Sequence, residues 1–349
     1  MKFLEHTKLP SVPQLNPTMN GRVSLRLLIV CGVLGLLVEG ADEDRYQEEF
    51  AALAEGRNIR FGDKKFMKMT MAERHVRITF TLYTKRNQAN GQEIRLNDMK
   101  TLRKGDFDAG KPTHFVTHGF LNNGKHQSCT LIRNAYLLRS DCNVIIVDWS
   151  RYSYKVYPLA VLKLRSIGQE VAKMINFMCE RAKLRNKSTT LVGYSLGAHI
   201  MGIAGYNTKY KVNFIVGLDP ALPGFITAGP ERSISTQSGK HVQLIHTNGG
   251  ILGYLNAAGH SDFFPNGGKQ QTGCSKIIAV CSHERAYQLF ATSITTTING
   301  TRCESYEAFE AGACGSDAYV APMGGLDPKH VRPGKYYLRT GSQPPYSVQ

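Results

Sequence analysis

The chain has 349 residues, of which 42% are hydrophobic and 20% charged, and its formal net charge is +16. These values exclude a disordered chain and fit a folded protein with a sizeable core. The basic balance favours anionic surfaces such as acidic lipid headgroups or heparin-like sulfated polysaccharide. Nucleic acid is the weaker interpretation, because no motif of interleaved basic and aromatic residues accompanies the charge.

The N-terminal region contains a candidate secretory signal. An apolar run of twelve residues, 27–38, follows Arg22 and Arg26 and is followed by small residues. A run of this length is too short to cross a bilayer comfortably and is typical of a signal peptide. We expect cleavage near Gly40 or Ala41 and a secreted, extracellular protein, with an uncleaved signal anchor as the alternative.

The remainder of the chain reads as one domain. Removal of the signal lowers the net charge only from +16 to +14, so the mature chain stays basic. No internal repeat, low-complexity stretch or long linker interrupts it. The expected parts are an N-terminal extension with signal peptide (1–40), an N-terminal segment (41–69) and a single domain (70–349).

Short segments rich in β-branched and apolar residues recur along the chain and predict strands. They are 75–83, 114–117, 143–149, 189–192, 212–218 and 241–246. Between residues 149 and 189, apolar side chains at three- and four-residue steps predict a long amphipathic helix. Apolar strands separated by helical stretches are typical of a largely parallel sheet with helices on both faces, and the predicted fold class is therefore α/β.

The strongest chemical signal follows the predicted strand 189–192. There Gly193-Tyr-Ser195-Leu-Gly197 is followed by an apolar helical run. A Gly-x-Ser-x-Gly sequence between a strand and a helix is typical of a strained turn that exposes a nucleophilic serine, and the two glycines leave room for it. Ser195 is the predicted nucleophile.

A serine hydroxyl needs an imidazole to take its proton and a carboxylate to orient that imidazole. Asp219 directly follows the predicted strand 212–218, and His283 lies downstream of it beside Cys281. This order of serine, acid and histidine is typical of the α/β-hydrolase arrangement. A turn aspartate is the bland alternative for Asp219. The competing histidines are His118, His199, His246 and His260, the last in what reads as a turn-rich loop.

A tetrahedral intermediate also needs two donors for its oxyanion. The backbone N–H of Leu196 supplies one. The second should come from the turn after an early strand, and we predict the N–H of Phe120 for this role. Core packing is the alternative role for Phe120.

Eight cysteines indicate an oxidising compartment. Cys31 lies in the predicted signal, and Cys179 is expected to be a buried free thiol. The other six form local pairs, and the expected disulfides are Cys129–Cys142, Cys274–Cys281 and Cys303–Cys314. No spacing suggests a metal site. Asn186 and Asn299 begin glycosylation sequons, which agree with secretion.

Seven blocks in order resemble the pancreatic lipase family, in particular its insect lipase and phospholipase A1 branch, over residues 70–340. The blocks are His118-Gly-Phe120, Val147-Asp-Trp149, Gly193-Tyr-Ser-Leu-Gly-Ala-His199, Gly217-Leu-Asp-Pro-Ala221, Ile245-His-Thr247, Asp262-Phe-Phe-Pro-Asn-Gly-Gly268 and Cys281-Ser-His283. The resemblance implies an α/β-hydrolase fold, the same triad, and oxyanion donors at Phe120 and Leu196.

Some residues depart from the family pattern. Tyr194 stands where the family usually has histidine, and activity is still expected. The loop Glu231–Lys240 has one acidic residue in place of the aspartate-rich calcium loop of mammalian members, so we expect no calcium and no other cofactor. With the chain ending at Gln349, neither a C-terminal β-sandwich nor its protein cofactor is expected.

The resemblance gives opposing indications about the lipid. The loop between Cys274 and Cys281 encloses only six residues, and so short a lid goes with phospholipase A1 or galactolipid activity. The loop from Pro220 to Gln243 is not shortened, which goes with neutral lipids. We expect a secreted serine ester hydrolase acting by an acyl-enzyme on phospholipid or triacylglycerol at a lipid interface. A non-catalytic lipid-binding or yolk-like protein is the alternative, and hydrolysis of other esters a third.

Overall fold

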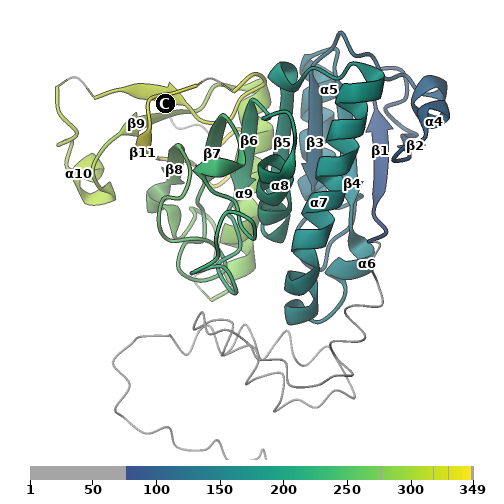
Figure 1. Ribbon diagram of the computed structural model, residues 1–349. Helices are drawn as coiled ribbons and strands as arrows, with labels where there is room; N and C mark the ends of the chain where they lie inside the picture. Colours follow the sequence, from purple (N-terminus) through teal and green to yellow (C-terminus); the bar gives the residue numbers. More distant parts are fainter. Residues whose placement is uncertain (1–75, 276, 317, 329, 347–349) are drawn as a thin grey trace, which may run out of the picture. The chain divides into compact units, whose positions relative to one another are not determined.

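The computed structural model describes residues 76–275, 277–316, 318–328 and 330–346, so the predicted signal peptide and the boundaries at 40 and 69 lie outside the described residues. Within these described residues, eleven strands form one sheet in the order β10-β9-β11-β8-β7-β6-β5-β3-β4-β1-β2 (Figure 1). Their bounds are β1 Thr79–Tyr83, β2 Gln92–Ile94, β3 Thr113–Thr117, β4 Asn143–Asp148, β5 Thr189–Tyr194, β6 Phe214–Leu218, β7 His241–Ile245, β8 Ser261–Pro265, β9 Asn299–Arg302, β10 Val320–Pro322 and β11 Gly334–Leu338.

The central strands from β4 to β11 run parallel, and antiparallel strands border them at both ends. Their register aligns the carboxyl ends of neighbouring strands. Tyr194 at the end of β5 lies opposite Leu218 at the end of β6, and Leu218 lies opposite Ile245 at the end of β7. Residues that directly follow these strands therefore meet at one edge of the sheet.

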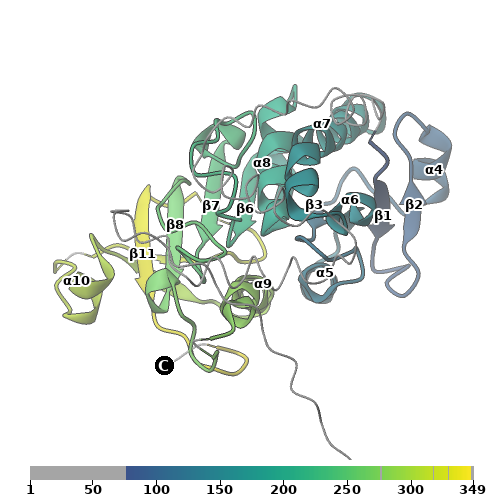
Figure 2. The same cartoon turned by 90° about the horizontal axis from the view of Figure 1, so that it is seen from below.

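Helices cover both faces of the sheet. α7 packs against α8 on one face, and α5 packs against α9 on the other (Figure 2). Successive side chains of a strand point to opposite faces of the sheet, so that Phe115 of β3 packs in the core on one face and Val116 in the core on the other. The helices are α4 Met99–Lys104, α5 Gln127–Arg139, α6 Ser150–Ser153, α7 Tyr157–Ala182, α8 Leu196–Asn207, α9 Ala279–Thr295 and α10 Tyr306–Glu310. The predicted α/β architecture is confirmed.

The long predicted helix is α7. Its buried stripe, which includes Ile167, Val171 and Met178, packs on the sheet and on α8. Pro158 lies in its first turn, where a missing N–H costs no hydrogen bond. Lys183 ends the helix in the left-handed conformation, and its N–H bonds the Met178 carbonyl. Among the described helices, none is long and apolar enough to span a bilayer.

The prediction of a turn-rich loop around His260 is wrong for the residues that follow it. Ser261–Pro265 is β8, a fully buried strand between β7 and β11. The sequence conceals it because Ser261 and Asp262 are polar, yet both are buried with hydrogen-bonded partners.

The disulfides Cys274–Cys281 and Cys303–Cys314 are present. The predicted Cys129–Cys142 bond is wrong: both cysteines are free and buried in the core that α5 and α9 form with the sheet. Cys129 lies in the first turn of α5, and Cys142 lies beyond its other end. The helical run from 129 to 139 spans about 15 Å, whereas a disulfide needs Cα atoms within about 7 Å. Cys179, expected to be buried, is a free thiol that is only partly buried.

Candidate active site

Ser195 occupies a strained turn between β5 and α8. Its φ is 56° and its ψ −121°, which is a rare conformation for a residue with a side chain. The flanking glycines make room for it. A Cβ at Gly193 would lie 2.1 Å from the Gly197 carbonyl oxygen, and one at Gly197 would lie 2.4 Å from the His118 carbonyl oxygen. The local sequence therefore presents the Ser195 hydroxyl at the carboxyl edge of the sheet.

Asp219 follows β6 at the same edge and is fully buried. Its two oxygens have separate partners. Oδ1 accepts hydrogen bonds from the backbone N–H groups of Thr247 (2.8 Å) and Asn248 (3.1 Å). Oδ2 lies 2.6 Å from His283 Nδ1. A buried carboxylate with these partners is electrostatically satisfied and held in one orientation.

His283 lies in the first turns of α9 and connects the other two side chains. Its Nδ1 faces Asp219, and its Nε2 lies 2.8 Å from Ser195 Oγ. Because a carboxylate only accepts, Nδ1 carries the proton, and Nε2 is left to accept the hydroxyl proton of the serine. The ring of Tyr194 packs against His283 at 4.8 Å between centroids. The structure thus brings together the three side chains that the sequence analysis selected.

The competing histidines have structural partners. His199 Nε2 donates to the Ala221 carbonyl, and its Nδ1 accepts from the Ile234 N–H. Burial lowers the pKa of this ring to about 4, although the Ala221 carbonyl opposes this. His246 is paired with Asp262 at 2.8 Å; burial opposes protonation, but that carboxylate raises the pKa of His246 above its usual value. His260 accepts from the Val242 N–H.

Two backbone N–H groups lie beside the nucleophile. The N–H of Leu196 begins α8, and that of Phe120 lies in the loop after β3; no described residue accepts a hydrogen bond from either. A Cβ at Gly119 would lie 3.0 Å from Ser195 Cβ, so the loop touches the nucleophile. The Phe120 ring packs edge-on against Tyr157 at 5.0 Å, so this residue also has a packing role.

The loop closed by Cys274–Cys281 directly precedes His283. Three of its apolar side chains face solvent: Ile277 is 92% exposed, Ile278 60% and Val280 50%. Isoleucine is most often fully buried in folded proteins. An apolar, disulfide-bounded segment therefore lies in the chain immediately before the histidine of the site.

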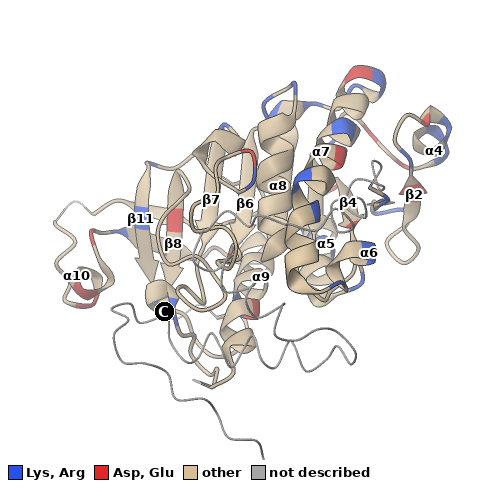
Figure 3. Ribbon diagram, turned by 60° about the horizontal axis from the view of Figure 1, so that its bottom comes forward, with Lys and Arg blue, Asp and Glu red and all other residues tan. Residues whose placement is uncertain are grey.

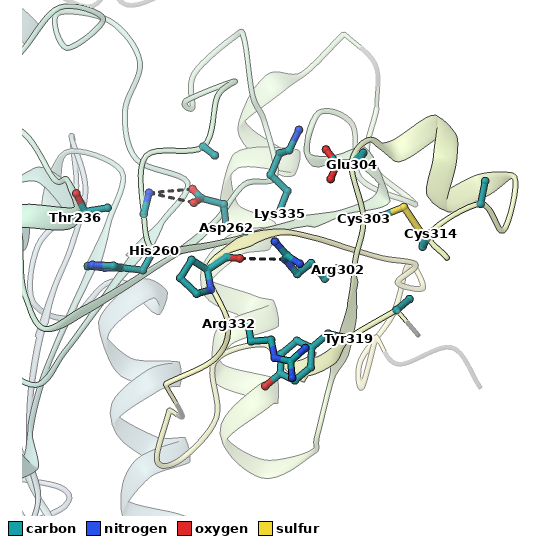
Figure 4. A pocket seen from close by; sticks show the side chains of 16 residues that line it. Thr236, His260, Asp262, Arg302, Cys303, Glu304, Cys314, Tyr319, Arg332 and Lys335 are labelled. Carbon is teal, nitrogen blue, oxygen red and sulfur yellow. Dashed lines mark hydrogen bonds between the residues drawn. A yellow bond between two sulfur atoms is a disulfide. The ribbon is translucent and has the colours of Figure 1, made fainter. Parts of the chain in front are cut away.

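A separate cavity of about 530 Å³ lies near β8, β9 and β11 (Figure 4). His260, Asp262, Arg302 and Lys335 line it, and Arg332 stacks over Tyr319 at 4.8 Å. None of Ser195, Asp219 and His283 is among its lining residues. This cavity therefore does not coincide with the site that the side-chain chemistry defines.

Other predicted features also have places in the structure. Asn299 is exposed at the start of β9, whereas Asn186 is half-buried and its Nδ2 donates to the Lys211 carbonyl. Among the described residues, no cluster of three acidic, histidine or cysteine side chains is suited to a metal ion.

Sequence reasoning assigned no role to Asp148, although Val147-Asp-Trp149 was one of the matching blocks. Asp148 lies at the end of β4 and bonds His118 at 3.2 Å. Thr247 and Asn248, whose N–H groups hold Asp219, were also missed. The residue types at 247 and 248 do not indicate this role, because the donors are backbone N–H groups that the fold brings to Asp219.

This sheet order, with a serine at a strand-to-helix turn and its partners after later strands, defines the α/β-hydrolase class. Comparison with known proteins gives the family. The Lipase family model matches residues 52–346, and the chain belongs to the lipase family.

Similar curated proteins include guinea pig (Cavia porcellus) pancreatic triacylglycerol lipase, 32% identical over 78% of this chain and 65% of that protein. Human lipoprotein lipase is 37% identical over 69% of this chain and 57% of its own length. Coypu (Myocastor coypus) pancreatic lipase-related protein 2 is 34% identical over 67% of this chain and 55% of its own. The chain thus matches only 55–65% of the length of these relatives.

Among solved structures, an α/β-hydrolase enzyme from a deep-sea metagenome library is similar at 14% identity and a TM-score of 0.32, covering 52% of this chain and 68% of that one. Acetyl xylan esterase from Aspergillus awamori is similar at 10% identity and a TM-score of 0.32, covering 51% and 70%.

Proposed function

We propose that this protein is a serine hydrolase that cleaves acyl esters of lipids with Ser195, Asp219 and His283. The observation that carries the proposal is the hydrogen-bonded chain from Asp219 Oδ2 through His283 to Ser195 Oγ, at 2.6 and 2.8 Å. Three segments far apart in the sequence converge with the proton positions that nucleophilic catalysis requires.

In the proposed acylation step, His283 Nε2 takes the Ser195 proton while Oγ attacks the ester carbonyl carbon. The N–H groups of Phe120 and Leu196 stabilise the resulting oxyanion. Collapse of this intermediate breaks the bond to the alcohol oxygen, which receives the proton from His283. Water, deprotonated by the same imidazole, then attacks the acyl-enzyme and releases the carboxylic acid and Ser195.

The test is ester hydrolysis by the purified protein and by Ser195→Ala, with Ser166→Ala on the exposed side of α7 as a matched control. We expect Ser195→Ala to lose nearly all turnover and Ser166→Ala to match the wild type. Equal inactivity of wild type and Ser195→Ala would favour the non-catalytic lipid-binding protein, whereas activity that survives in Ser195→Ala would contradict the role of Ser195 as the nucleophile.

The lid, which is the loop closed by Cys274–Cys281, bears on the class of substrate. Its exposed isoleucines are suited to contact lipid, and a lid of six residues between Cys274 and Cys281 leaves space for a polar headgroup, which supports phospholipase A1 activity. The full-length loop 220–243 and the similarity to a triacylglycerol lipase support neutral lipids. Fatty-acid release from phosphatidylcholine, galactolipid and triacylglycerol, compared at equal enzyme, decides between them.

We further propose that the protein is secreted and binds polyanions. Two disulfides are typical of an oxidising compartment. Exposed lysines and arginines gather where β5, β6 and β7 begin, at the sheet edge opposite Ser195. They are Arg181, Lys183, Arg185, Lys187, Lys209, Lys211 and Lys240. Figure 3 shows basic positions along α7 and beyond the end of α8. A sulfated polysaccharide bound there would leave the site free to face lipid.

A further inference from the structure

The motif His118-Gly119-Phe120 contributes more than one backbone donor. His118 is completely buried directly after β3, yet it is not part of the triad. Its Nδ1 lies 2.9 Å from the carbonyl oxygen of Gly119, the next residue. Its Nε2 lies 3.2 Å from both the Trp149 N–H nitrogen and Asp148 Oδ1. Every polar atom of this imidazole is therefore engaged.

The carbonyl that His118 holds belongs to the same peptide unit as the Phe120 N–H. This peptide is trans, and in a trans peptide the C=O and N–H point in opposite directions. Fixing the Gly119 oxygen on the His118 side consequently directs the Phe120 N–H to the other side. Because Gly119 packs against Ser195, a rotation of this peptide would aim a carbonyl oxygen, rather than a donor, at the developing oxyanion.

The proton needed for this contact stays on Nδ1 in either charge state of the ring. A carbonyl oxygen can only accept, so Nδ1 donates. In the neutral form Nε2 accepts from the Trp149 N–H, and in the charged form it donates to Asp148. The contact to Gly119 therefore does not depend on the protonation state of His118.

The β4–α6 segment keeps the imidazole from rotating. Asp148 accepts from the N–H groups of Ser150 (2.8 Å, at Oδ1) and Gly124 (2.9 Å, at Oδ2). Burial raises the pKa of its carboxyl, but these bonds and His118 outweigh it and hold the pKa below the usual range. Trp149 Nε1 donates to the His118 carbonyl at 3.0 Å, and its ring stacks on the imidazole.

We propose that His118 is a positioning residue which fixes the Gly119–Phe120 peptide so that the Phe120 N–H is aimed at the oxyanion before substrate binds. This inference rests on the proposed hydrolase function. It assigns His118 no contact with substrate, so its effect must be on the transition state and not on ground-state binding.

The test compares two amides that each mimic one end of the imidazole. In His118→Gln the amide reaches the Nε2 position, and the donor to Gly119 is lost. In His118→Asn the amide nitrogen lies near the Nδ1 position and can keep that donor. For a soluble ester we expect His118→Gln to lower kcat by about 100-fold or more with KM nearly unchanged, as when an oxyanion donor is removed. His118→Asn should recover most of that loss.

The matched control is His114→Gln. It alters a second buried histidine, which lies within β3 and stacks on Tyr136, away from the site. It should lower the melting temperature but leave kcat per folded molecule unchanged. Phosphonylation of Ser195 by a p-nitrophenyl phosphonate should slow in parallel with kcat in His118→Gln. The inference is overturned if His118→Gln keeps kcat within threefold of wild type, raises only KM, or equals His118→Asn. A wild type as inactive as Ser195→Ala would instead overturn the hydrolase proposal.

Discussion

The unequal partners of the two Asp219 oxygens decide which nitrogen of His283 carries the proton. Two backbone N–H groups hold Oδ1, so only Oδ2 is free to face the imidazole. A carboxylate in this position selects the Nδ1–H tautomer and stabilises the imidazolium that forms when Ser195 loses its proton.

This arrangement predicts the effect of Asp219→Asn. The amide oxygen should remain on the Thr247 and Asn248 N–H groups, which turns the NH2 group toward His283 Nδ1. The imidazole proton then moves to Nε2, which can no longer accept from Ser195. We expect kcat to fall by roughly 10³- to 10⁴-fold with the melting temperature little changed. Steady-state kinetics on a soluble ester measures this, and a loss below tenfold would contradict the tautomer argument.

Buried neutral histidines predict how stability depends on pH. Burial lowers the pKa of His114 to about 3, although Asp327 opposes this, and its Nδ1 has no hydrogen-bond partner among the described residues. In the unfolded chain this ring titrates near 6.5. Between these values the unfolded state binds the extra proton, so the free energy of unfolding falls as pH decreases from about 6.5.

We therefore expect His114→Phe to flatten the loss of stability between pH 6.5 and 4, because phenylalanine keeps the ring stacked on Tyr136 and does not titrate. Urea unfolding at several pH values measures the slope. His330→Phe, at an exposed position, is the control and should leave more of the slope intact. An unchanged slope in His114→Phe would show that other groups dominate acid unfolding.

Among the elements, the lid segment between Cys274 and Cys281 runs into the first turn of α9, the helix that carries His283. Ile277 and Ile278 gain nothing from exposure to water, and burying such a side chain in lipid is worth about 2 kcal/mol. We expect Ile277→Ser to weaken adsorption to emulsified lipid by about tenfold or more and to leave hydrolysis of a soluble ester unchanged.

Vesicle or emulsion sedimentation measures this adsorption. The matched control is Val320→Ser, which removes an exposed apolar side chain from β10 at the far edge of the sheet. Equal losses in the two variants would mean that general surface hydrophobicity, and not the lid, drives adsorption.

Helix α5 separates Cys129 and Cys142, whose short separation in the sequence predicted a disulfide between them. We expect denaturation with N-ethylmaleimide before reduction to label Cys129, Cys142 and Cys179, and to leave the other four described cysteines unlabelled. Peptide mass mapping reads this directly. A linked peptide that contains both Cys129 and Cys142 would contradict the observed geometry of α5.

The contrast between these elements shows what sequence reasoning can recover. Apolar strands such as β3 and β5, and the stripe of α7, were predictable because periodicity reflects burial. The side chains Ser195, Asp219 and His283 were predictable because their chemistry and order are distinctive. The strand β8 was missed because its polar residues Ser261 and Asp262 are buried against His241 and His246, which only the fold brings beside them. The Cys129–Cys142 bond was mispredicted because disulfide geometry depends on the path of the chain between the cysteines, not on their spacing in the sequence.

At the scale of the whole molecule, the parallel sheet places the cluster of basic residues and the candidate active site at opposite edges. The basic cluster lies where strands begin, and the site lies where they end. We expect the protein to bind heparin-agarose and to elute with rising salt, because contacts between exposed charges are screened. Soluble heparin should leave hydrolysis of a small ester unchanged.

Replacing Lys183 and Lys187 together by glutamine should lower the salt needed for elution. A matched change of Lys100 and Lys104 on α4, which packs beside the edge strand β2, should have less effect. Inhibition of small-ester hydrolysis by heparin would place the polyanion at the site itself.

Trp149 is the single tryptophan of the 349-residue chain, and its indole lies flat against His118. Selective ultraviolet excitation of tryptophan would consequently yield emission from this one site in the protein. Any event that shifts the neighbouring turn, such as arrival of an acyl chain or docking on a micelle, would change the brightness or colour of that emission. The protein thus carries an intrinsic fluorescent reporter beside the turn that holds Phe120.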